Sequence, residues 1–236
     1  MAAKKKRLVQ AAPPLRAVMP TVATLSGGGA ERGGEVEGKG EREENSGGET
    51  WGQELPNGSE YWCHGRDLRD LARLGARLLP RLRTDLPTLL VSECCLCYLE
   101  AGQARAVVAH FADQIADSSG GGGLGIALYE PVHPDDAFGR QMVANLAARR
   151  IRMPTLDAYR DAPAQRARLR DAGFDSVRAM SVEEIWRAWV PDEEKERVDA
   201  LEGLDEVEEW NLLAAHYIVA WAWRGRGFEG WGDGEG

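Results

Sequence analysis

The sequence predicts an α/β fold built on a sheet that contains parallel strands. Apolar, strand-like runs at 86–91 and 124–130 are separated by a helical pattern over 100–117. Parallel strands need a crossover connection, and alternating strands and helices supply one. Two strand-like runs end near acidic residues, at Asp67 and Glu93. Because ligands bind at the carboxyl ends of parallel strands, we expect both carboxylates to hold one small polar ligand from successive strands of one sheet.

The composition restricts the classes of partner. The chain has 236 residues, of which 43% are hydrophobic, enough for one large domain or two small ones. The net charge of −9 argues against a general binder of nucleic acids or anionic membranes. No apolar run approaches the ~18 residues of a membrane span, and the basic run Lys4–Arg7 lacks the apolar stretch of a signal peptide. We therefore expect a cytoplasmic protein with no nucleic-acid partner and no membrane partner.

The N-terminal quarter changes character twice. Residues 3–18 are predicted to be helical, with a break or kink at Pro13-Pro14. Residues 19–58 are rich in glycine and glutamate and are predicted to be a loop or a disordered insertion. These glycines do not predict a phosphate cradle, because no strand precedes them and no helix follows. We expect three parts: a helix plus loop over 1–58, the main domain over 59–230 and a flexible tail over 231–236.

From residue 59 the pattern becomes regular. Tyr61–His64 is predicted to be a short strand that ends near Asp67, and 70–79 a helix with Asp70 as its N-cap. The apolar run from Leu86 to Val91 indicates a strand covered on both faces. Residues 120–123 are predicted to be a flexible link.

The second half is predicted to contain more helices than strands. Helices are expected over 136–150, 157–171 and 192–213, and strands over 174–180 and 216–223. Ser181 and Glu184 have the spacing of a capping box, which predicts a helix that begins between them. The aromatic residues near Trp221 are expected in the core or at a sheet edge, since stacking on nucleic acid would need a basic face.

Six short pieces of this chain, in order and at plausible spacing, resemble the leucine carboxyl methyltransferase family, particularly its fungal forms. They are DLRDL at 67–71, LPTLLVSEC at 86–94, Tyr129-Glu130, DAFGRQM at 136–142, LDEVE at 204–208 and HYxxxWA at 216–222. Together they span residues 59–224. Residues 3–18 resemble, more weakly, the helix after the family's second strand.

The resemblance implies a class I, Rossmann-like methyltransferase fold with seven strands, and S-adenosylmethionine as methyl donor. It also implies a substrate and partner, the C-terminal leucine carboxylate of the protein phosphatase 2A catalytic subunit. By position, Asp67 and Leu68 match the pair that binds adenine, and Glu93 matches another cofactor-binding acid. Tyr98 matches the substrate side. The residues with catalytic roles stay unassigned.

Parts of the family pattern have no counterpart in this sequence. These are a glycine-rich turn after the first strand, an arginine that faces the carboxylates and an acid after the second strand. With five strand candidates against seven, we expect the first two strands to be missing, as if Met1 lay inside a longer ancestral protein. We therefore expect the chain alone to bind S-adenosylmethionine weakly. A non-catalytic remnant that binds a partner is the alternative function.

Simpler interpretations stand beside these site predictions. Asp67 and Asp70 also suit the start of a helix, and Glu93 suits an ordinary surface position. Cys63-His64 and the group Cys94, Cys95 and Cys97 could suggest zinc, but strand alternation sends Cys94 to the face opposite the other two. We expect no metal there or at His133–Asp136. The cysteines at 94–97 are expected to be reduced and buried.

Overall fold

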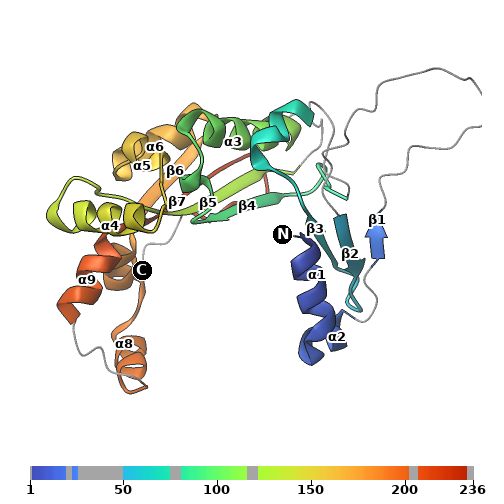
Figure 1. Ribbon diagram of the computed structural model, residues 1–236, viewed down its shortest axis with the longest axis horizontal. Helices are drawn as coiled ribbons and strands as arrows, with labels where there is room; N and C mark the ends of the chain where they lie inside the picture. The colour runs from blue at the N-terminus through green and yellow to red at the C-terminus, as the bar shows by residue number, and fades with distance from the viewer. Residues whose placement is uncertain are drawn as a thin grey trace, which may run out of the picture. The chain divides into compact units, whose positions relative to one another are not determined.

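The computed structural model describes residues 2–19, 23–25, 50–74, 81–115, 122–201 and 207–232 (Figure 1). The chain forms two compact units. The first consists of Met1–Asp70 with Arg77–Leu82, and the second of Leu71–Ala76 with Arg83–Gly236. The sequence places a boundary at residue 58, whereas the division between these units falls between residues 70 and 83. Each unit is described by itself below.

Two short helices begin the first unit. Helix α1 covers Ala2–Ala11 and α2 covers Pro13–Val18, so the break expected at Pro13-Pro14 is confirmed. Pro13 opens α2 because a first-turn proline has no intrahelical N–H bond to lose. The indole Nε1 of Trp51 donates to the carbonyl of Ala2 at 2.9 Å, which ties α1 to the sheet of this unit.

The first unit also contains an antiparallel sheet, in the order β1 (Ala23–Leu25), β2 (Thr50–Glu54) and β3 (Glu60–His64). The expectation of a loop throughout 19–58 is therefore wrong at both ends. Trp51 in β2 is fully buried. Gly58 takes a φ of +79° in the turn between β2 and β3, where glycine carries no steric cost. The predicted loop at 26–49 lies outside the described residues.

The strand predicted at Tyr61–His64 is confirmed as β3, but it belongs to a different sheet from the strand that ends at Glu93. The expectation that Asp67 and Glu93 end neighbouring strands of one sheet is wrong. The segment after Asp67 forms the 3-10 helix η1 (Leu68–Leu74). Asp70 lies inside this helix rather than at its N-cap, so that expectation is also wrong. The rest of the helix predicted to residue 79 lies outside the described residues.

The second unit is built on a mixed sheet in the order β4-β5-β7-β6. The strands are β4 (Thr88–Glu93), β5 (Leu124–Pro131), β6 (Ser176–Ser181) and β7 (Tyr217–Arg224). Strands β4 and β5 are parallel and joined through α3 (Ala101–Ile115), which confirms the predicted strand–helix–strand unit. Strand β7 lies between β5 and β6 and runs antiparallel to both. The fold class is α/β, as predicted.

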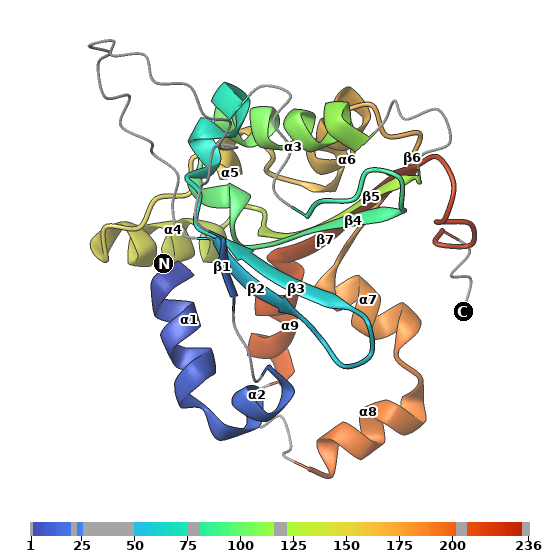
Figure 2. The ribbon, with the colours of Figure 1, turned by 90° about the vertical axis from the view of Figure 1, so that its right-hand side faces the viewer.

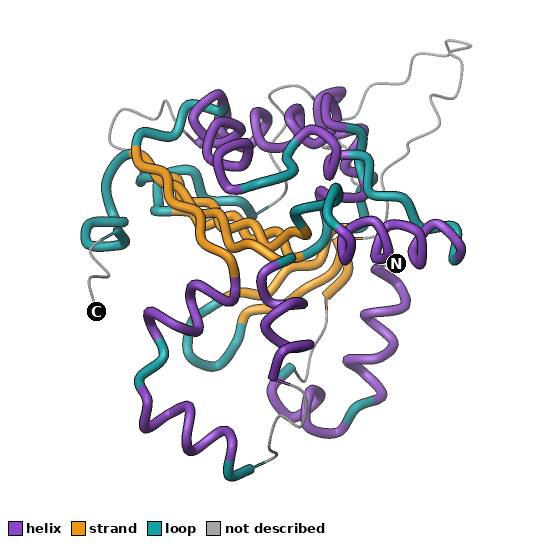
Figure 3. The backbone as a smooth tube through the Cα atoms, turned by 90° about the vertical axis from the view of Figure 1, so that its left-hand side faces the viewer, coloured by secondary structure: helices purple, strands orange, loops and turns teal. Residues whose placement is uncertain are grey.

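Helices cover both faces of this sheet. Helices α3 and α6 (Ala162–Asp171) lie on one face, and α7 (Val182–Trp189) and α9 (Val207–Ala215) on the other (Figures 2 and 3). The capping box predicted at Ser181 and Glu184 is present and begins α7. Helix α4 (Ala137–Ala148) confirms the helix expected after Asp136.

Two predicted helices are each divided in the structure. The helix expected over 157–171 forms α5 (Thr155–Ala158) and α6, because the Asp161 side chain caps α6 and begins a new helix there. The helix expected over 192–213 is not continuous, since α8 covers Asp192–Asp199 and ends there. Residues 202–206, which hold most of the LDEVE piece, lie outside the described residues, as do residues 120–121 of the link expected at 120–123.

The core of the second unit lies under β5 and β7. Leu124, Ile126 and Leu128 are almost fully buried, as are Ala220 and Ala222 of β7, and Trp221 is buried as expected. Strand β4 differs because it is at the edge of the sheet, and Leu89 and Val91 are exposed. The expectation that this strand is covered on both faces is wrong, because no further strand pairs with its outer edge in the described part of the chain.

Candidate functional site

The chain turns sharply where β4 ends. Glu93 pairs with Tyr129 in the parallel ladder, and the next residue, Cys94, donates its backbone N–H to the carbonyl of Tyr129 at 2.9 Å. Cys94 has a φ of +42°, in the left-handed region, which costs a residue other than glycine about 1–2 kcal/mol. The turn leaves the Glu93 carboxylate exposed at the carboxyl end of two parallel strands, where ligands bind in such sheets.

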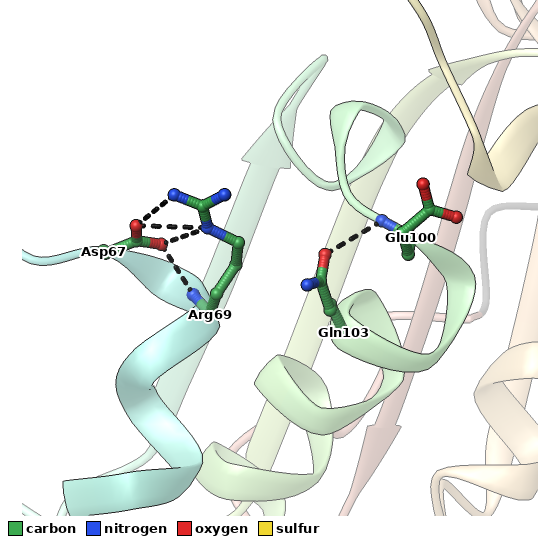
Figure 4. Close-up of polar contacts among 4 residues, drawn as sticks. All are labelled: Asp67, Arg69, Glu100 and Gln103. Atoms are coloured by element: carbon green, nitrogen blue, oxygen red, sulfur yellow. Dashed lines mark hydrogen bonds and ion pairs between the residues drawn. The ribbon is translucent and has the colours of Figure 1, made fainter.

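A short 3-10 helix, η2 (Leu96–Tyr98), holds Tyr98 beside this turn. Leu96 and Cys97 are buried and anchor the helix, while 49% of the Tyr98 surface is exposed. The backbone N–H of Glu100 then donates to the side-chain oxygen of Gln103 at 3.2 Å, at the entrance to α3 (Figure 4). The order Glu93, turn, Tyr98 and α3 puts a carboxylate and a phenol within one short connection.

Two further tyrosines stand at the same end of the sheet. The rings of Tyr129 on β5 and Tyr217 on β7 stack at 5.2 Å between centroids, with 14° between their planes. Burial, followed by neighbouring groups that include Tyr217, raises the pKa of Tyr98 and of Tyr129 above the ordinary value. Burial also raises the pKa of Tyr217. At neutral pH all three hydroxyl groups therefore carry their protons and can donate hydrogen bonds.

The thiols near this turn are not arranged for metal binding or nucleophilic attack. All four cysteines are unpaired; Cys97 is buried, Cys94 is partly exposed and Cys95 is exposed, so the expectation of burial holds for Cys97 alone. Burial raises the pKa of the Cys97 thiol to about 12, and raises that of Cys94 as well. Thiols with raised pKa values stay protonated and react slowly. Among the described residues, no group of three or more His, Cys, Asp or Glu side chains could hold a metal ion.

A buried ion pair fixes the end of β5 to α6. Arg168 Nη1 lies 2.7 Å from Glu130 Oε2, and the two side chains are 3% and 2% exposed. Gln165 donates to the same carboxylate oxygen and accepts from Arg168, and the Tyr159 ring covers the guanidinium at 4.3 Å. Glu130 Oε1 and Arg168 Nε and Nη2 have no hydrogen-bond partner within the described part of the chain. The pair is therefore held by the Arg168 Nη1–Glu130 Oε2 contact and by Gln165, which bonds to both side chains.

Asp136 links α4 to the start of β7. Its Oδ1 accepts the backbone N–H of Gly139 at 2.7 Å, as an N-cap does, and His216 Nε2 lies 2.9 Å from each of its carboxylate oxygens. The Gly139 N–H and then His216 hold the pKa of Asp136 below its ordinary value. His216 Nδ1 lies 2.7 Å from the carbonyl of Leu212, so both ring nitrogens face acceptors. The role of Asp136 in the structure is therefore that of an N-cap at the start of α4.

Asp67 and Leu68 belong to the first unit, whereas Glu93 and Tyr98 belong to the second. The Asp67 carboxylate accepts from the backbone N–H of Arg69 at 2.9 Å and from its guanidinium, with Nη2 2.5 Å from Oδ2 (Figure 4). These hydrogen bonds lower the pKa of Asp67 to about 2. Leu68 is partly buried and opens η1. Asp67 thus directly precedes η1 and accepts a backbone N–H from its first turn, as expected for a residue at the start of a helix.

In the structure, Glu93 and Tyr98 lie on the same short connection between β4 and α3. Tyr129 and Tyr217 also lie at this end of the sheet; both occur in the family motifs, but the sequence alone assigned them no role. A signal for Tyr217 was available only after the pairing of β5 with β7 was known, because nearly 90 residues separate it from Tyr129. None of the helices in the described part of the chain is both long and apolar enough to span a bilayer.

Comparison with known proteins gives close sequence relatives but no matching protein-family model. Leucine carboxyl methyltransferase 1 from Emericella nidulans is 50% identical over 188 residues, which cover 73% of this chain and 49% of that protein. tRNA wybutosine-synthesizing protein 4 from Rattus norvegicus is 37% identical over 170 residues, 71% of this chain and 24% of that protein. The chain spans about half the length of the leucine carboxyl methyltransferases that it matches.

Solved structures give a much weaker similarity. An O-methyltransferase family protein from Burkholderia thailandensis aligns with a TM-score of 0.37 at 15% identity, over 69% of this chain and 35% of that one. A score this low adds nothing to the assignment, which depends on the sequence relatives.

Proposed function

The chain belongs to the leucine carboxyl methyltransferase family, and from that premise we propose that it takes part in S-adenosylmethionine-dependent methylation of a C-terminal leucine carboxylate. The substrate proposed is the protein phosphatase 2A catalytic subunit, and the proposed location is the cytoplasm. The observation that carries the proposal is the 50% identity over 188 residues to the Emericella nidulans relative. Four unpaired cysteines fit a reducing compartment.

The residues at the carboxyl end of β4 suit this cofactor. S-adenosylmethionine supplies an electrophilic methyl group on a cationic sulfonium. The exposed Glu93 carboxylate can accept hydrogen bonds from hydroxyl groups of a ribose, and it contributes a negative charge near a cation. Stacked aromatic rings such as Tyr129 and Tyr217 also attract cations that lie against their faces. These properties support a cofactor-binding role for Glu93.

Asp67 and Leu68 are proposed to bind the adenine ring. A carboxylate can accept from the adenine amino group while the backbone N–H of the next residue donates to a ring nitrogen. In the structure, Arg69 occupies the Asp67 carboxylate with four hydrogen bonds. Adenine binding through this side chain therefore requires Arg69 to give up at least part of its contact, which makes Arg69 a competitor for the same oxygen atoms.

Tyr98 is proposed to lie on the substrate side. Its hydroxyl is protonated at neutral pH, since burial raises the pKa of Tyr98 further above the ordinary value near 10, so it can donate to a carboxylate. The acceptor is already ionised, since an α-carboxyl group has a pKa of about 3.3–3.7. No strong general base is required, and catalysis depends on alignment of the two groups and removal of water from both charges.

The proposal is tested with the purified chain, S-adenosylmethionine labelled in its methyl group and the phosphatase catalytic subunit. We expect slow incorporation of label as a base-labile methyl ester, with none into a subunit that lacks its C-terminal leucine. A Glu93→Gln variant should reduce incorporation, whereas Glu100→Gln, on the same connection, should not. Incorporation that is unchanged by the loss of the leucine would contradict the proposed substrate.

The alternative is a non-catalytic protein that binds a partner. The same experiment separates the two functions. If the chain binds the phosphatase subunit in a pull-down with purified proteins but transfers no methyl group, the non-catalytic function is correct.

A further inference from the structure

A pocket of about 220 Å³ opens on the second unit between the C-terminal half of α4, the segment 151–154 and α5. Its apolar lining residues include Val143, Leu146, Ile151, Met153 and Leu156, while polar groups contribute as much of its surface as apolar ones. Arg152 and Asp157 also line the pocket. An engineered apolar cavity of roughly 150 Å³ binds benzene, so this pocket has room for one bulky apolar side chain.

The surroundings of the pocket are strongly basic in an acidic protein. Residues 137–171 contain eight arginines and three acidic residues, whereas the whole chain has a net charge of −9. Arg160 and Arg168 have carboxylate partners, Asp135 and Glu130. The exposed side chains of Arg149, Arg150 and Arg152 form no ion pair within the described part of the chain. A ligand that carries negative charge would complement this rim.

The backbone at the pocket rim favours the same interpretation. Arg150 follows the end of α4 with a φ of +61°, a position where helices commonly place glycine. An arginine in the left-handed region costs about 1–2 kcal/mol. Its N–H donates to Ala147, and that of Ile151 donates to Leu146, so the turn is closed by residues that line the pocket. The turn places the exposed Arg150 directly before Ile151, the first residue of the 151–154 segment that lines the pocket.

The pocket lies beside a helix that packs against the short helix carrying Tyr98. Leu156, which lines the pocket, is buried, and its helix α5 packs against η2. The wall of the pocket is therefore one helix away from the end of β4, where the reaction is proposed to take place. A protein substrate bound at one position would have neighbouring residues within reach of the other.

We propose that this pocket docks an acidic segment of the protein substrate that carries one bulky apolar side chain. The apolar side chain fills the pocket. Carboxylates of the residues before and after it in the segment form ion pairs with Arg149, Arg150 and Arg152. This inference rests on the proposed function, because it concerns how the methyl acceptor is held. RNA phosphates could also meet the arginines, but a polyphosphate chain offers no apolar side chain for the cavity.

The test uses the full chain without S-adenosylmethionine and a fluorescein-labelled peptide, Asp-Glu-Asp-Phe-Glu-Asp, amidated at its C-terminus. Fluorescence anisotropy should detect binding that weakens at least about tenfold, or ~1.4 kcal/mol, when the phenylalanine is replaced by alanine. Ala147→Phe, which fills the pocket, should weaken binding of the peptide by a similar factor. Ala144→Phe is the matched control on the same helix, since Ala144 is exposed and does not line the pocket.

Charge is tested in the same way. Arg152→Glu should abolish binding, whereas Arg170→Glu, an equal charge change at an exposed position of α6, should alter it less than about twofold. Equal losses in the two charge variants, or in the two phenylalanine variants, would overturn the docking site. Displacement of the peptide by bulk tRNA, with no effect of Ala147→Phe on tRNA affinity, would favour RNA instead. Because the peptide has neither a leucine nor a free carboxyl terminus, these results are independent of methyl transfer.

Discussion

Two carboxylate–guanidinium pairs in this protein have the same chemistry in opposite surroundings. Glu130 and Arg168 are 2% and 3% exposed and lie 2.7 Å apart in the second unit. Asp67 and Arg69 are 40% and 59% exposed and lie 2.5 Å apart in the first unit. The distances are similar, so geometry alone does not separate them. Solvent does, because water screens the exposed pair and is absent from the buried one.

Because of this difference in solvent exposure, we expect the two ion pairs to have different roles. Removal of one partner from the buried pair leaves an uncompensated charge in the interior. The intact pair therefore stabilises the packing of α6 against β5. Loss of the exposed pair costs little, because water replaces either partner. The Asp67 carboxylate can therefore exchange Arg69 for a ligand. This exchange is what the proposed adenine site requires.

The largest effect should follow a break in the buried pair. Arg168→Met is expected to lower the free energy of unfolding by about 3–5 kcal/mol, because Glu130 is left charged and buried. Urea unfolding monitored by tryptophan fluorescence measures this loss. The double variant Glu130→Met/Arg168→Met should recover most of it, because no buried charge remains. A double variant as unstable as the single one would contradict this account of the pair.

An intermediate effect is expected at Asp136, which is half-exposed but caps α4. Asp136→Ala should lower the free energy of unfolding by about 1 kcal/mol through the lost N-cap. Asp175→Ala is the matched control, because Asp175 is exposed and precedes β6 without capping a helix. Equal unfolding midpoints for wild type and Asp136→Ala would show that the contacts to Gly139 and His216 do not stabilise the protein.

The same carboxylate predicts the direction of a pH effect. The pKa of Asp136 is lowered in the folded protein, so its stabilisation is fully present above the ordinary value near 3.8. It is lost as the pH falls through the lower folded value. Unfolding curves collected between neutral and acidic pH should therefore converge for wild type and Asp136→Ala at the acidic end. A difference that grows with acidification has the wrong sign for this explanation.

The smallest effect on stability should come from the exposed pair. Arg69→Ala is expected to leave the unfolding midpoint unchanged, but to raise the pKa of Asp67 from about 2 toward its ordinary value of 3.8. NMR titration of the Asp67 carboxyl carbon measures the shift. Arg83→Ala, which removes the exposed partner of Asp85, should raise the pKa of Asp85 and leave Asp67 unchanged. An unchanged Asp67 pKa in Arg69→Ala would mean that Arg69 is not its main partner.

Local patterns in the sequence predicted most of the second unit. The helix over α3 and the capping box at Ser181 involve contacts within a few residues, and the apolar run before Glu130 marks a strand by composition alone; the structure confirms each. The sheet partners of β3 could not be predicted in the same way. Pairing of β3 with β2 depends on the turn at Asn57-Gly58, a hairpin signal that the surrounding glycine-rich composition obscured.

The candidate site was predicted in part. The position of Glu93 at a strand end and of Tyr98 just beyond it followed from the strand pattern and the family resemblance. Tyr217 could not be assigned, because its contact with Tyr129 arises from antiparallel pairing across a long sequence separation. The ion pair between Arg69 and Asp67 was also not predicted, although only one residue separates them in the sequence. Spacing alone does not determine the direction of the two side chains.

The central claim is that the connection after β4 is the cofactor side of a methyltransferase site. Titration of the ¹⁵N-labelled chain with S-adenosylmethionine, followed by NMR, tests it directly even where binding is weak. The account predicts saturable shifts in the amide signals of Glu93, Cys94 and Cys95, and their loss in Glu93→Gln. Shifts confined to other parts of the chain, or shifts at these amides that persist unchanged in Glu93→Gln, would contradict it.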